Sequence, residues 1–220
     1  MNSLTDNPTA SNAATDTLRC VLASGNQGKL KELSGALAEL NIELVSQSEF
    51  NVTEAIEDAT TFVENALIKA KHASDSTGLS ALADDSGLVV PALKGEPGIH
   101  SARFAMADNA TIKPTDQDNI NKLLQVLAPM QENARAAYFV CSLVFLRHAK
   151  DPEPIIANGI WHGRILQHAE GDAGFGYDPV FYCPQVGMTA AAMGSVKKSA
   201  VSHRAIALRE LKQKLSQSTY

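Results

Sequence analysis

The sequence predicts an α/β domain built on a mixed β-sheet. Segments with helical periodicity occur near the start, in the middle and at the end of the chain, and both isolated and neighbouring strand-like runs lie between them. A chain of 220 residues with 45% hydrophobic residues can bury one sizeable core. We therefore expect one domain over residues 18–220, after a disordered tail at residues 1–17 that is rich in Ser, Thr, Asn, Asp and Ala.

The first half of the domain is expected to contain two helices and short strands. The run LRCVLA at residues 18–23 predicts a strand, and KLKELSGALAEL at residues 29–40 predicts a helix because its leucines recur at helical spacing. A second helix is expected from Thr61 to Ser74, since Thr61 and Glu64 have capping-box spacing. The segments LSALA and LVVPAL predict two short strands on either side of a turn at DDSG, residues 84–87.

The second half is expected to begin and end with a helix. The first of these helices is predicted from about Asp116 to Ala128, and AAYFVCSLVFL at residues 136–146 predicts a strand. Two further strand-like runs, PIIANGI and WHGRIL, are expected around a short turn at His162 and Gly163. The glycine-rich loop GDAGFGYDPVFY runs into a strand, and the last helix begins near Ser202. The predicted inner side of that helix carries Ala205, Leu208, Leu211 and Leu215.

Charge and hydropathy exclude several kinds of partner. The formal net charge of −5 argues against a broad nucleic-acid surface, because such a surface needs clustered Lys and Arg. The longest apolar run, Ala136 to Leu146, is shorter than the ~18 residues that cross a bilayer. The three cysteines are far apart, which suggests neither a disulfide framework nor a metal knuckle and fits a reducing cytoplasm. We expect no nucleic acid and no membrane as partners, and any anionic partner must be small.

The turn SGNQGK, from Ser24 to Lys29, lies where a strand becomes a helix. Exposed backbone N–H groups and the positive end of the helix dipole favour an anion there. Gly25 and Gly28 permit close approach and Lys29 adds a full charge, so a phosphate is the natural ligand. An ordinary turn with a surface lysine fits this stretch equally well. The turn is not a P-loop, because Leu30 stands where a Ser or Thr would bind magnesium.

Three carboxylates could hold the metal that cleavage of a polyphosphate usually requires. Mg²⁺ is commonly bound by one or two carboxylates together with phosphate oxygens and waters. Asp84 and Asp85 follow a predicted strand and Glu57 precedes a predicted helix, so all three could meet at one edge of the sheet. The two aspartates could instead cap a turn in which Gly87 has a positive φ angle. If the pair stays extended, the side chains point in opposite directions, and one faces the metal while the other supports the turn.

Further cationic side chains could neutralise phosphate charge. Lys69, Lys198 and Arg204 are candidates for this role, although each could also lie on a solvated helix surface. Ser202 is explained as the N-cap of the last helix. His203 and Arg204 could donate hydrogen bonds to a carbonyl oxygen of a base, or decorate the helix surface.

The segment GFGYDP offers groups for a nucleotide base. Phe175 and Tyr177 could present aromatic faces to the base, and Asp178 could accept hydrogen bonds from the base or the ribose. The alternative is a turn whose aromatic side chains enter the core. Phe181 and Tyr182, in the strand that follows, fit a core position better.

Several segments in order along the chain resemble the inosine triphosphate pyrophosphatase family, which includes the bacterial dITP/XTP pyrophosphatases. They are SGNQGKLKEL, TFVENALIKAKHA, ALADDSGL, PGIHSARFA, GFGYDPVF and KSAVSHRAIAL, and the similarity runs from about Leu18 to Leu211. The resemblance implies an elongated, mixed central sheet flanked by helices, and a homodimer. It also implies Mg²⁺-dependent hydrolysis of ITP, dITP and XTP to the monophosphate and pyrophosphate, which keeps aberrant purines out of DNA and RNA.

The same resemblance implies roles for individual residues. Asp85 matches the position of the proton acceptor and metal ligand, and Glu57, with Asp84 nearby, matches the acidic metal position. The segment before Lys198 reads GSVK, less acidic than in many relatives, which leaves Lys197 and Lys198 as alternatives for facing the ligand. The implied substrate-binding positions are Ser24 (Thr in many members), Gly25, Asn26, Gln27, Gly28, Lys29, Lys69, Ser86, Phe175, Gly176, Tyr177, Asp178, Lys198, His203 and Arg204.

Two other functions are compatible with the same residues. One is a related pyrophosphatase that acts on other modified nucleotides, such as methylated pyrimidines. The other is a nucleotide-binding sensor that keeps the phosphate turn and the base pocket without turnover. Glu57, Asp84 and Asp85 argue against the sensor, because a pure phosphate binder gains nothing from negative charge beside the anion.

Overall fold

A computed structural model of the chain describes residues 17–107 and 111–218. The predicted disordered tail at residues 1–17 therefore lies, apart from Thr17, outside the described residues. The strands are β1 (Leu18–Leu22), β2 (Ile42–Ser46), β3 (Ser80–Val89), β4 (Ala136–Leu146), β5 (Ile155–Ile165), β6 (Phe181–Cys183) and β7 (Met188–Thr189). They form one sheet in the order β2-β1-β3-β4-β5-β6-β7. β1 is parallel to β2 and β3 and the later pairs are antiparallel, so the predicted mixed sheet is confirmed.

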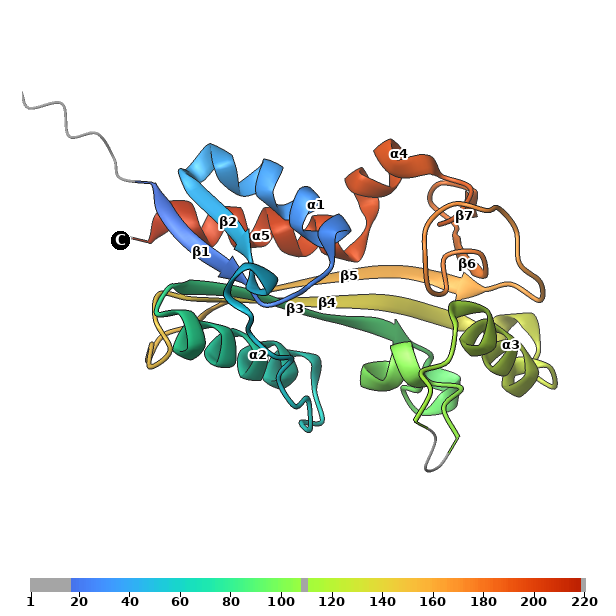
Figure 1. Cartoon of the computed structure of the whole chain (residues 1–220). Helices are drawn as coiled ribbons and strands as arrows, with labels where there is room; N and C mark the ends of the chain where they lie inside the picture. The colour runs from blue at the N-terminus through green and yellow to red at the C-terminus, as the bar shows by residue number, and fades with distance from the viewer. Residues whose placement is uncertain (1–16, 108–110, 219–220) are drawn as a thin grey trace, which may run out of the picture.

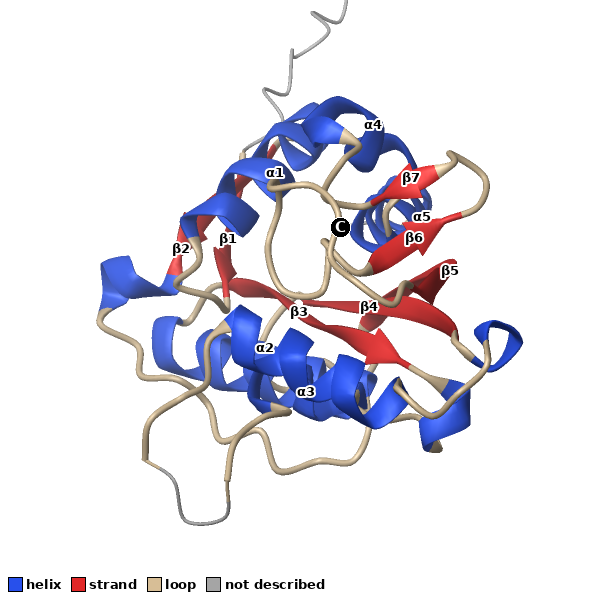
Figure 2. Cartoon of the chain, turned by 90° about the vertical axis from the view of Figure 1, so that its right-hand side faces the viewer, coloured by secondary structure: helices blue, strands red, loops and turns tan. Residues whose placement is uncertain are grey.

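Helices cover both faces of this sheet (Figures 1 and 2). The α-helices in the described part of the chain are α1 (Gln27–Leu37), α2 (Phe62–Thr77), α3 (Asp116–Leu127), α4 (Gly194–Val201) and α5 (His203–Gln217). Short 3₁₀ helices are η1 (Ala38–Leu40), η2 (Gln47–Phe50), η3 (Pro91–Leu93), η4 (Gly98–Arg103) and η5 (Glu132–Ala134). α1, α4 and α5 lie on one side of the sheet, and α2 and α3 lie on the other. None of the helices within residues 17–107 and 111–218 has the length and apolar character that spanning a bilayer requires.

Alternate residues of β3 pack against different helical layers. Leu82 lies in a buried cluster with Leu33 of α1 and Leu211 of α5. Ala81 and Ala83 lie in another cluster with the alanines on the inner face of α2. Because side chains alternate along a strand, Asp84 and Asp85 continue this pattern toward the two layers in turn.

Two predicted turns are wrong. β3 runs without interruption through DDSG, and β5 runs without interruption through His162 and Gly163. The two glycines do not reverse the chain but let neighbouring backbone pack closely against the strands. A Cβ on Gly87 would lie 2.4 Å from the carbonyl oxygen of Gly98, and a Cβ on Gly163 would lie 2.5 Å from the carbonyl oxygen of Tyr182. β1 pairs only with Ser80–Leu82 of β3, so Asp84 and Asp85 lie just beyond the carboxyl end of β1 and pair with β4 alone, as the predicted position at an edge of the sheet requires.

The other predicted strands and α-helices are confirmed, whereas two strands, one α-helix and most of the 3₁₀ helices in the described residues were not predicted. The side chain of Thr61 caps α2 by accepting a hydrogen bond from the backbone N–H of Glu64, and Ser202 caps α5 in the same way through Ala205. β2, β7 and α4 were missed. The two strands are short, with 5 and 2 residues, and α4 has no buried residue to mark an inner face.

Candidate active site

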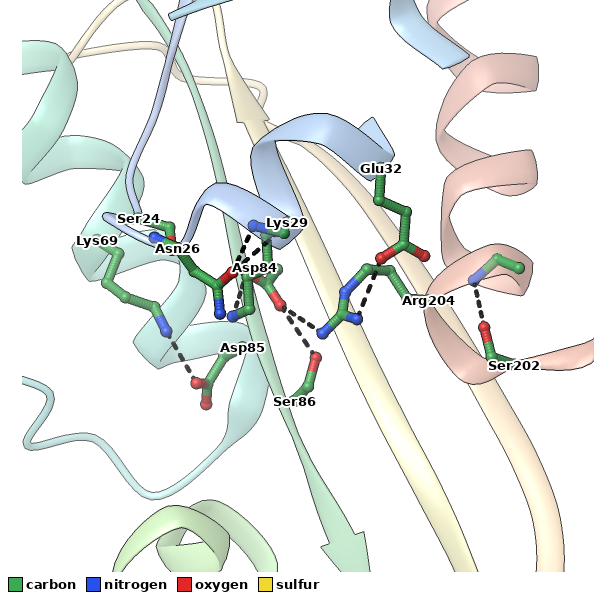
Figure 3. Close-up of polar contacts among 12 residues, drawn as sticks. Ser24, Asn26, Lys29, Glu32, Lys69, Asp84, Asp85, Ser86, Ser202 and Arg204 are labelled. Carbon is green, nitrogen blue, oxygen red and sulfur yellow. Dashed lines mark hydrogen bonds and ion pairs between the residues drawn. The ribbon is translucent and has the colours of Figure 1, made fainter. Parts of the chain in front are cut away.

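Asp84 and Asp85 lie in the middle of β3 and contact side chains from opposite layers of the fold (Figure 3). Asp84 contacts Lys29, in the first turn of α1, and Asp85 contacts Lys69 of α2. The extended alternative for the pair is therefore confirmed. The strand brings both carboxylates close to the start of α1 without letting them share a cation.

Asp84 is the centre of a buried network on the α1 and α5 side. Only 2% of its surface is exposed. Lys29 Nζ lies 2.7 Å from its Oδ1, a terminal nitrogen of Arg204 lies 3.5 Å from its Oδ2, and Ser86 Oγ donates to Oδ2 at 3.2 Å. Burial favours the protonated acid, but Lys29 and Arg204 outweigh it and hold the pKa of Asp84 well below its usual value. Asp84 thus ties α1 and α5 to β3.

Asp85 is paired on the α2 side. Lys69 Nζ lies 2.8 Å from Oδ1 of Asp85 and 3.0 Å from Oε2 of Glu57, so one ammonium bridges two carboxylates. Burial raises the pKa of Asp85; Lys69 opposes this shift, whereas Glu57 and Asp84 add to it. Burial lowers the pKa of Lys69, but the two carboxylates outweigh burial and the net shift is upward.

The middle of the Ser24–Lys29 turn, from Gly25 to Gly28, is exposed beside these carboxylates. Asn26 is the N-cap of α1, and its Oδ1 accepts hydrogen bonds from the N–H groups of Gly28 at 2.8 Å and Lys29 at 3.1 Å. Ser24 Oγ in turn accepts from the N–H of Asn26 at 3.2 Å. The N–H groups predicted to hold a phosphate are therefore satisfied partly by Asn26, whose side chain is exposed and could be exchanged for an anion.

A cavity of about 570 Å³ joins the turn to the carboxylates. Its walls come from the turn, from β3, from the segment before α2, and from η4 and the residues after it. Four cationic side chains and four carboxylates line it: Lys29, Lys69, Arg103, Lys113, Glu54, Glu57, Asp84 and Asp85. Of the cations, Lys29 and Lys69 are paired with carboxylates, whereas Arg103 contacts the ring of His100 and Lys113 is exposed.

Arg103, Lys113 and Glu54 were missed by sequence reasoning. In the sequence, the segment PGIHSARFA, which contains Arg103, indicates only a loop and a similarity to the family. Arg103 becomes a site candidate only once η4 is known to pack against β3. That contact depends on Gly87 and on Ser101, whose Oγ accepts a hydrogen bond from the N–H of Leu88 at 2.8 Å.

The residues present fit a divalent cation that is shared with a phosphate ligand. Within the described residues, no three His, Cys, Asp or Glu side chains gather into a metal site by themselves. Mg²⁺ in phosphoryl-transfer sites usually takes only one or two carboxylates, because phosphate oxygens and waters complete its octahedron. Glu57 and Asp85 meet this requirement, since their oxygens converge on one cationic group in the cavity.

A second set of predicted residues lies around the glycine-rich loop. Asp178 accepts a hydrogen bond from the N–H of Phe175 at 3.0 Å and forms a short ion pair with Lys198. Lys198 Nζ also lies 4.9 Å from the ring centre of Phe175, which is 59% exposed. Lys197 is exposed, so of the two lysines Lys198 is the one directed at the loop. The ring of Tyr177 is buried and its OH donates to the carbonyl oxygen of Ser101 at 2.9 Å, so that ring does not present a face to a base.

His203 and Arg204 are buried, so the surface-decoration alternative is wrong for both. The His203 ring stacks on Phe139 at 4.8 Å between ring centres. Burial, then the charges of Arg204 and Lys198, lower the pKa of His203 to about 3, so the ring is neutral near pH 7. His203 Nδ1 and Arg204 Nε have no hydrogen-bond partner within the described residues. Such buried polar atoms are costly unless a ligand satisfies them.

The predicted residues thus form two groups that Arg204 connects. The cavity with Asp84 and Asp85 is also lined by Glu57, Lys69, Ser86 and four residues of the turn: Ser24, Gly25, Asn26 and Lys29. Gln27 and Gly28 of the turn do not line it, nor do the glycine-rich loop, Lys198 and His203. Arg204 reaches Asp84 from the start of α5. A ligand with an anionic tail and a hydrogen-bonding head would span both groups.

The chain is similar to known proteins over most of its length. The model of the Ham1 family matches residues 20–214. The dITP/XTP pyrophosphatase of Vibrio vulnificus (strain YJ016) is 50% identical over 193 residues, which is 88% of this chain and 94% of that protein. A HAM1 protein from Coxiella burnetii superposes with a TM-score of 0.84 at 44% identity, covering 91% of this chain and 100% of that one. A nucleoside-triphosphatase, or dITP/XTP pyrophosphatase, from Mycobacterium abscessus superposes with a TM-score of 0.73 at 37% identity, covering 88% and 98%.

Proposed function

The chain belongs to the Ham1 family, and from that premise we propose that it hydrolyses deaminated purine nucleoside triphosphates to the monophosphate and pyrophosphate. One observation carries the proposal. Carboxylate oxygens of Glu57 and Asp85 both contact the ammonium of Lys69, in a cavity that residues of the Ser24–Lys29 turn also line. Relatives that are half identical over most of their length carry the name dITP/XTP pyrophosphatase. We infer that ITP, dITP and XTP are the substrates and that removing them cleanses the nucleotide pool.

Glu57 and Asp85 would hold Mg²⁺. When bound, this ion would neutralise phosphate charge and increase the acidity of a water molecule. Asp84 is the weaker candidate for a ligand, because its two oxygens already accept from Lys29, Arg204 and Ser86. Its role would be to fix the first turn of α1 and the start of α5 relative to β3.

Asp85 would act as the proton acceptor. A water oxygen forms a bond to the α-phosphorus, the bond from that phosphorus to the bridging oxygen breaks, and the water proton passes to a carboxylate oxygen of Asp85 as pyrophosphate leaves. The position of Asp85 supports this role, since its side chain is 13% exposed and lines the cavity. Lys69 and Arg103 would stabilise the charge that develops on the leaving pyrophosphate.

His203 and Arg204 would select the base. Hypoxanthine and xanthine carry a carbonyl oxygen at position 6, where adenine carries an amino group. A neutral His203 has one ring N–H, and Arg204 has an N–H that the described residues leave unpaired. A base that leaves a buried donor unpaired loses about 1–3 kcal/mol of binding, which favours ITP over ATP. We further propose that the enzyme is a cytoplasmic homodimer that binds neither nucleic acid nor membrane.

One assay tests the proposed function. Release of pyrophosphate would be measured with ITP, dITP, XTP, GTP, ATP and dTTP in Mg²⁺ and in excess EDTA. We expect the deaminated purines to be preferred and EDTA to abolish turnover. Preference for a methylated pyrimidine triphosphate would replace the proposed substrate class. Tight binding of ITP in Mg²⁺ without turnover would identify a sensor instead.

A further inference from the structure

Lys69 contacts both carboxylates that the proposed function assigns to the metal. Its ammonium lies 3.0 Å from Glu57 and 2.8 Å from Asp85, and its side chain is only 14% exposed. Resting on that proposed function, we propose that Lys69 is an internal cation that occupies the place of the divalent metal. It holds Glu57 and Asp85 together in the free protein, competes with Mg²⁺ for them, and transfers to the phosphates when the metal binds.

The backbone around Lys69 is fixed, so only its side chain has to move. The inner face of α2, with Ala66, Ala70 and Ala73, is buried against β1 and β3. Asn65, one turn before Lys69, accepts a hydrogen bond through Oδ1 from the N–H of Ala59 at 3.1 Å. This bond ties the segment that carries Glu57 to the same helix. Glu57, Lys69 and Asp85 therefore keep their relative positions when the ammonium swings away.

Charge explains why such a cation is needed before the metal binds. Glu57 and Asp85 repel one another, and Asp84 adds negative charge from the neighbouring position of β3. Lys29 cannot relieve this repulsion, because it contacts Asp84 on the other side of the strand. Lys69 is the cation that the structure places between Glu57 and Asp85.

Competition couples metal binding to nucleotide binding. Mg²⁺ binds the free protein weakly, since it must displace an ion-paired ammonium. A triphosphate supplies new oxygens both for the metal and for the displaced Lys69. Each ligand therefore favours the other, and by linkage the two enhancements are equal.

The test measures metal affinity without turnover. Binding of Mn²⁺ would be followed by the paramagnetic resonance signal of the free ion, and binding of Mg²⁺ by calorimetry, in the wild type and in Lys69→Met without nucleotide. Lys69→Met should bind either ion about tenfold more tightly, which corresponds to ~1.4 kcal/mol. A non-hydrolysable α,β-methylene analogue of ITP should then enhance metal binding less in the variant than in the wild type.

Two further variants control the measurement. Lys71→Met removes the same charge from an exposed position of α2 and should leave metal affinity unchanged. Lys69→Arg keeps the competing charge and should bind metal like the wild type, and circular dichroism verifies the fold of each variant. Metal affinity in Lys69→Met that equals or falls below the wild type overturns the inference, as does equal tightening in Lys71→Met. A wild type that releases no pyrophosphate speaks against the proposed function alone, because the metal titrations contain no turnover.

Discussion

Asp84 and Asp85 are consecutive residues of β3, yet Asp84 is paired with Lys29 of α1 and Asp85 with Lys69 of α2 on the other side of the sheet (Figure 3). Their surroundings differ as well as their partners. The side chain of Asp84 is 1% exposed and that of Asp85 is 13% exposed. Asp84 is therefore the more enclosed of the two carboxylates, and Asp85 is the more accessible one.

Replacing Asp84 is expected to destabilise the fold. Asp84→Asn leaves the buried Arg204 and the partly buried Lys29 without their shared counter-charge, and breaking a buried ion pair typically costs about 3–5 kcal/mol. The free energy of unfolding from urea titration measures this loss. The more exposed Asp85→Asn is the matched control and should cost clearly less. A larger loss of stability in Asp85→Asn would contradict the assignment of the structural role to Asp84.

Replacing Asp85 is expected to remove turnover while the fold persists. If Asp85 accepts the proton of the attacking water, Asp85→Asn should lower kcat by about 10²–10⁴-fold. Pyrophosphate release from ITP at saturating Mg²⁺ measures this change. Full activity of Asp85→Asn would remove Asp85 from the role of base.

The sequence predicted the residues of this site better than their arrangement. The apolar runs on either side of DDSG were read as two strands, because paired aspartates and a glycine are typical of turns. β3 is continuous because its backbone pairs with β4 from Ala81 to Val89, and its two aspartates contact lysines that are 55 and 16 positions away. Patterns within a short stretch of sequence do not reveal contacts with residues so far away along the chain. The same limit explains why Arg103 was missed as a lining residue of the cavity.

Helix ends were predicted more reliably, because their signals are local. Thr61 and Ser202 cap α2 and α5 through hydrogen bonds to residues three positions ahead. The burial of His203 and Arg204 depends instead on where α5 packs, which periodicity alone does not give. The sequence indicated those two residues as possible donors to a base and left a surface position open, and the structure supplied their burial and contacts.

Stability should depend on pH through His203. The pKa of His203 is lowered to about 3 in the folded protein, against an ordinary value of ~6.5 in the unfolded chain. Its stabilising contribution is therefore present above about pH 6.5 and is lost as pH falls toward 3, at up to ~1.4 kcal/mol per pH unit. Unfolding titrations from pH 7 to 5 should show a shallower dependence for His203→Gln than for the wild type. Equal slopes would mean that His203 is protonated in the folded state.

Arg103 is expected to bind the phosphate tail. It lines the cavity with no ion pair to a carboxylate among the described residues, and a hydrogen bond from a guanidinium to phosphate contributes about 1.5–3 kcal/mol. Arg103→Met should raise KM for ITP by about tenfold or more. It should also weaken binding of tripolyphosphate in calorimetry, with little effect on IMP. Arg103→Lys keeps the charge and should recover part of the affinity; equal losses for IMP and tripolyphosphate would place Arg103 away from the tail.

Gly159 is expected to set the position of the base-selecting residues. In β5, a Cβ at this position would lie 1.9 Å from the carbonyl oxygen of His203 and 2.6 Å from the backbone nitrogen of Ala207. Gly159→Ala must therefore push the start of α5 away from the sheet, because neither contact atom is the end of a flexible side chain. His203 and Arg204 would move with it, and the preference for ITP over ATP in kcat/KM should fall.

The matched control for this change is Gly35→Ala in α1, where a Cβ would meet no atom within 4 Å. That variant should keep the selectivity and gain about 0.5–1 kcal/mol of stability, because alanine is the better helix former. Selectivity and thermal unfolding of both variants would be measured side by side. Gly159→Ala with unchanged selectivity would show that contact between β5 and α5 does not position the base-selecting residues. A loss of selectivity with a retained melting profile would show that this backbone contact, and not the chemistry of His203 and Arg204 alone, sets the choice of base.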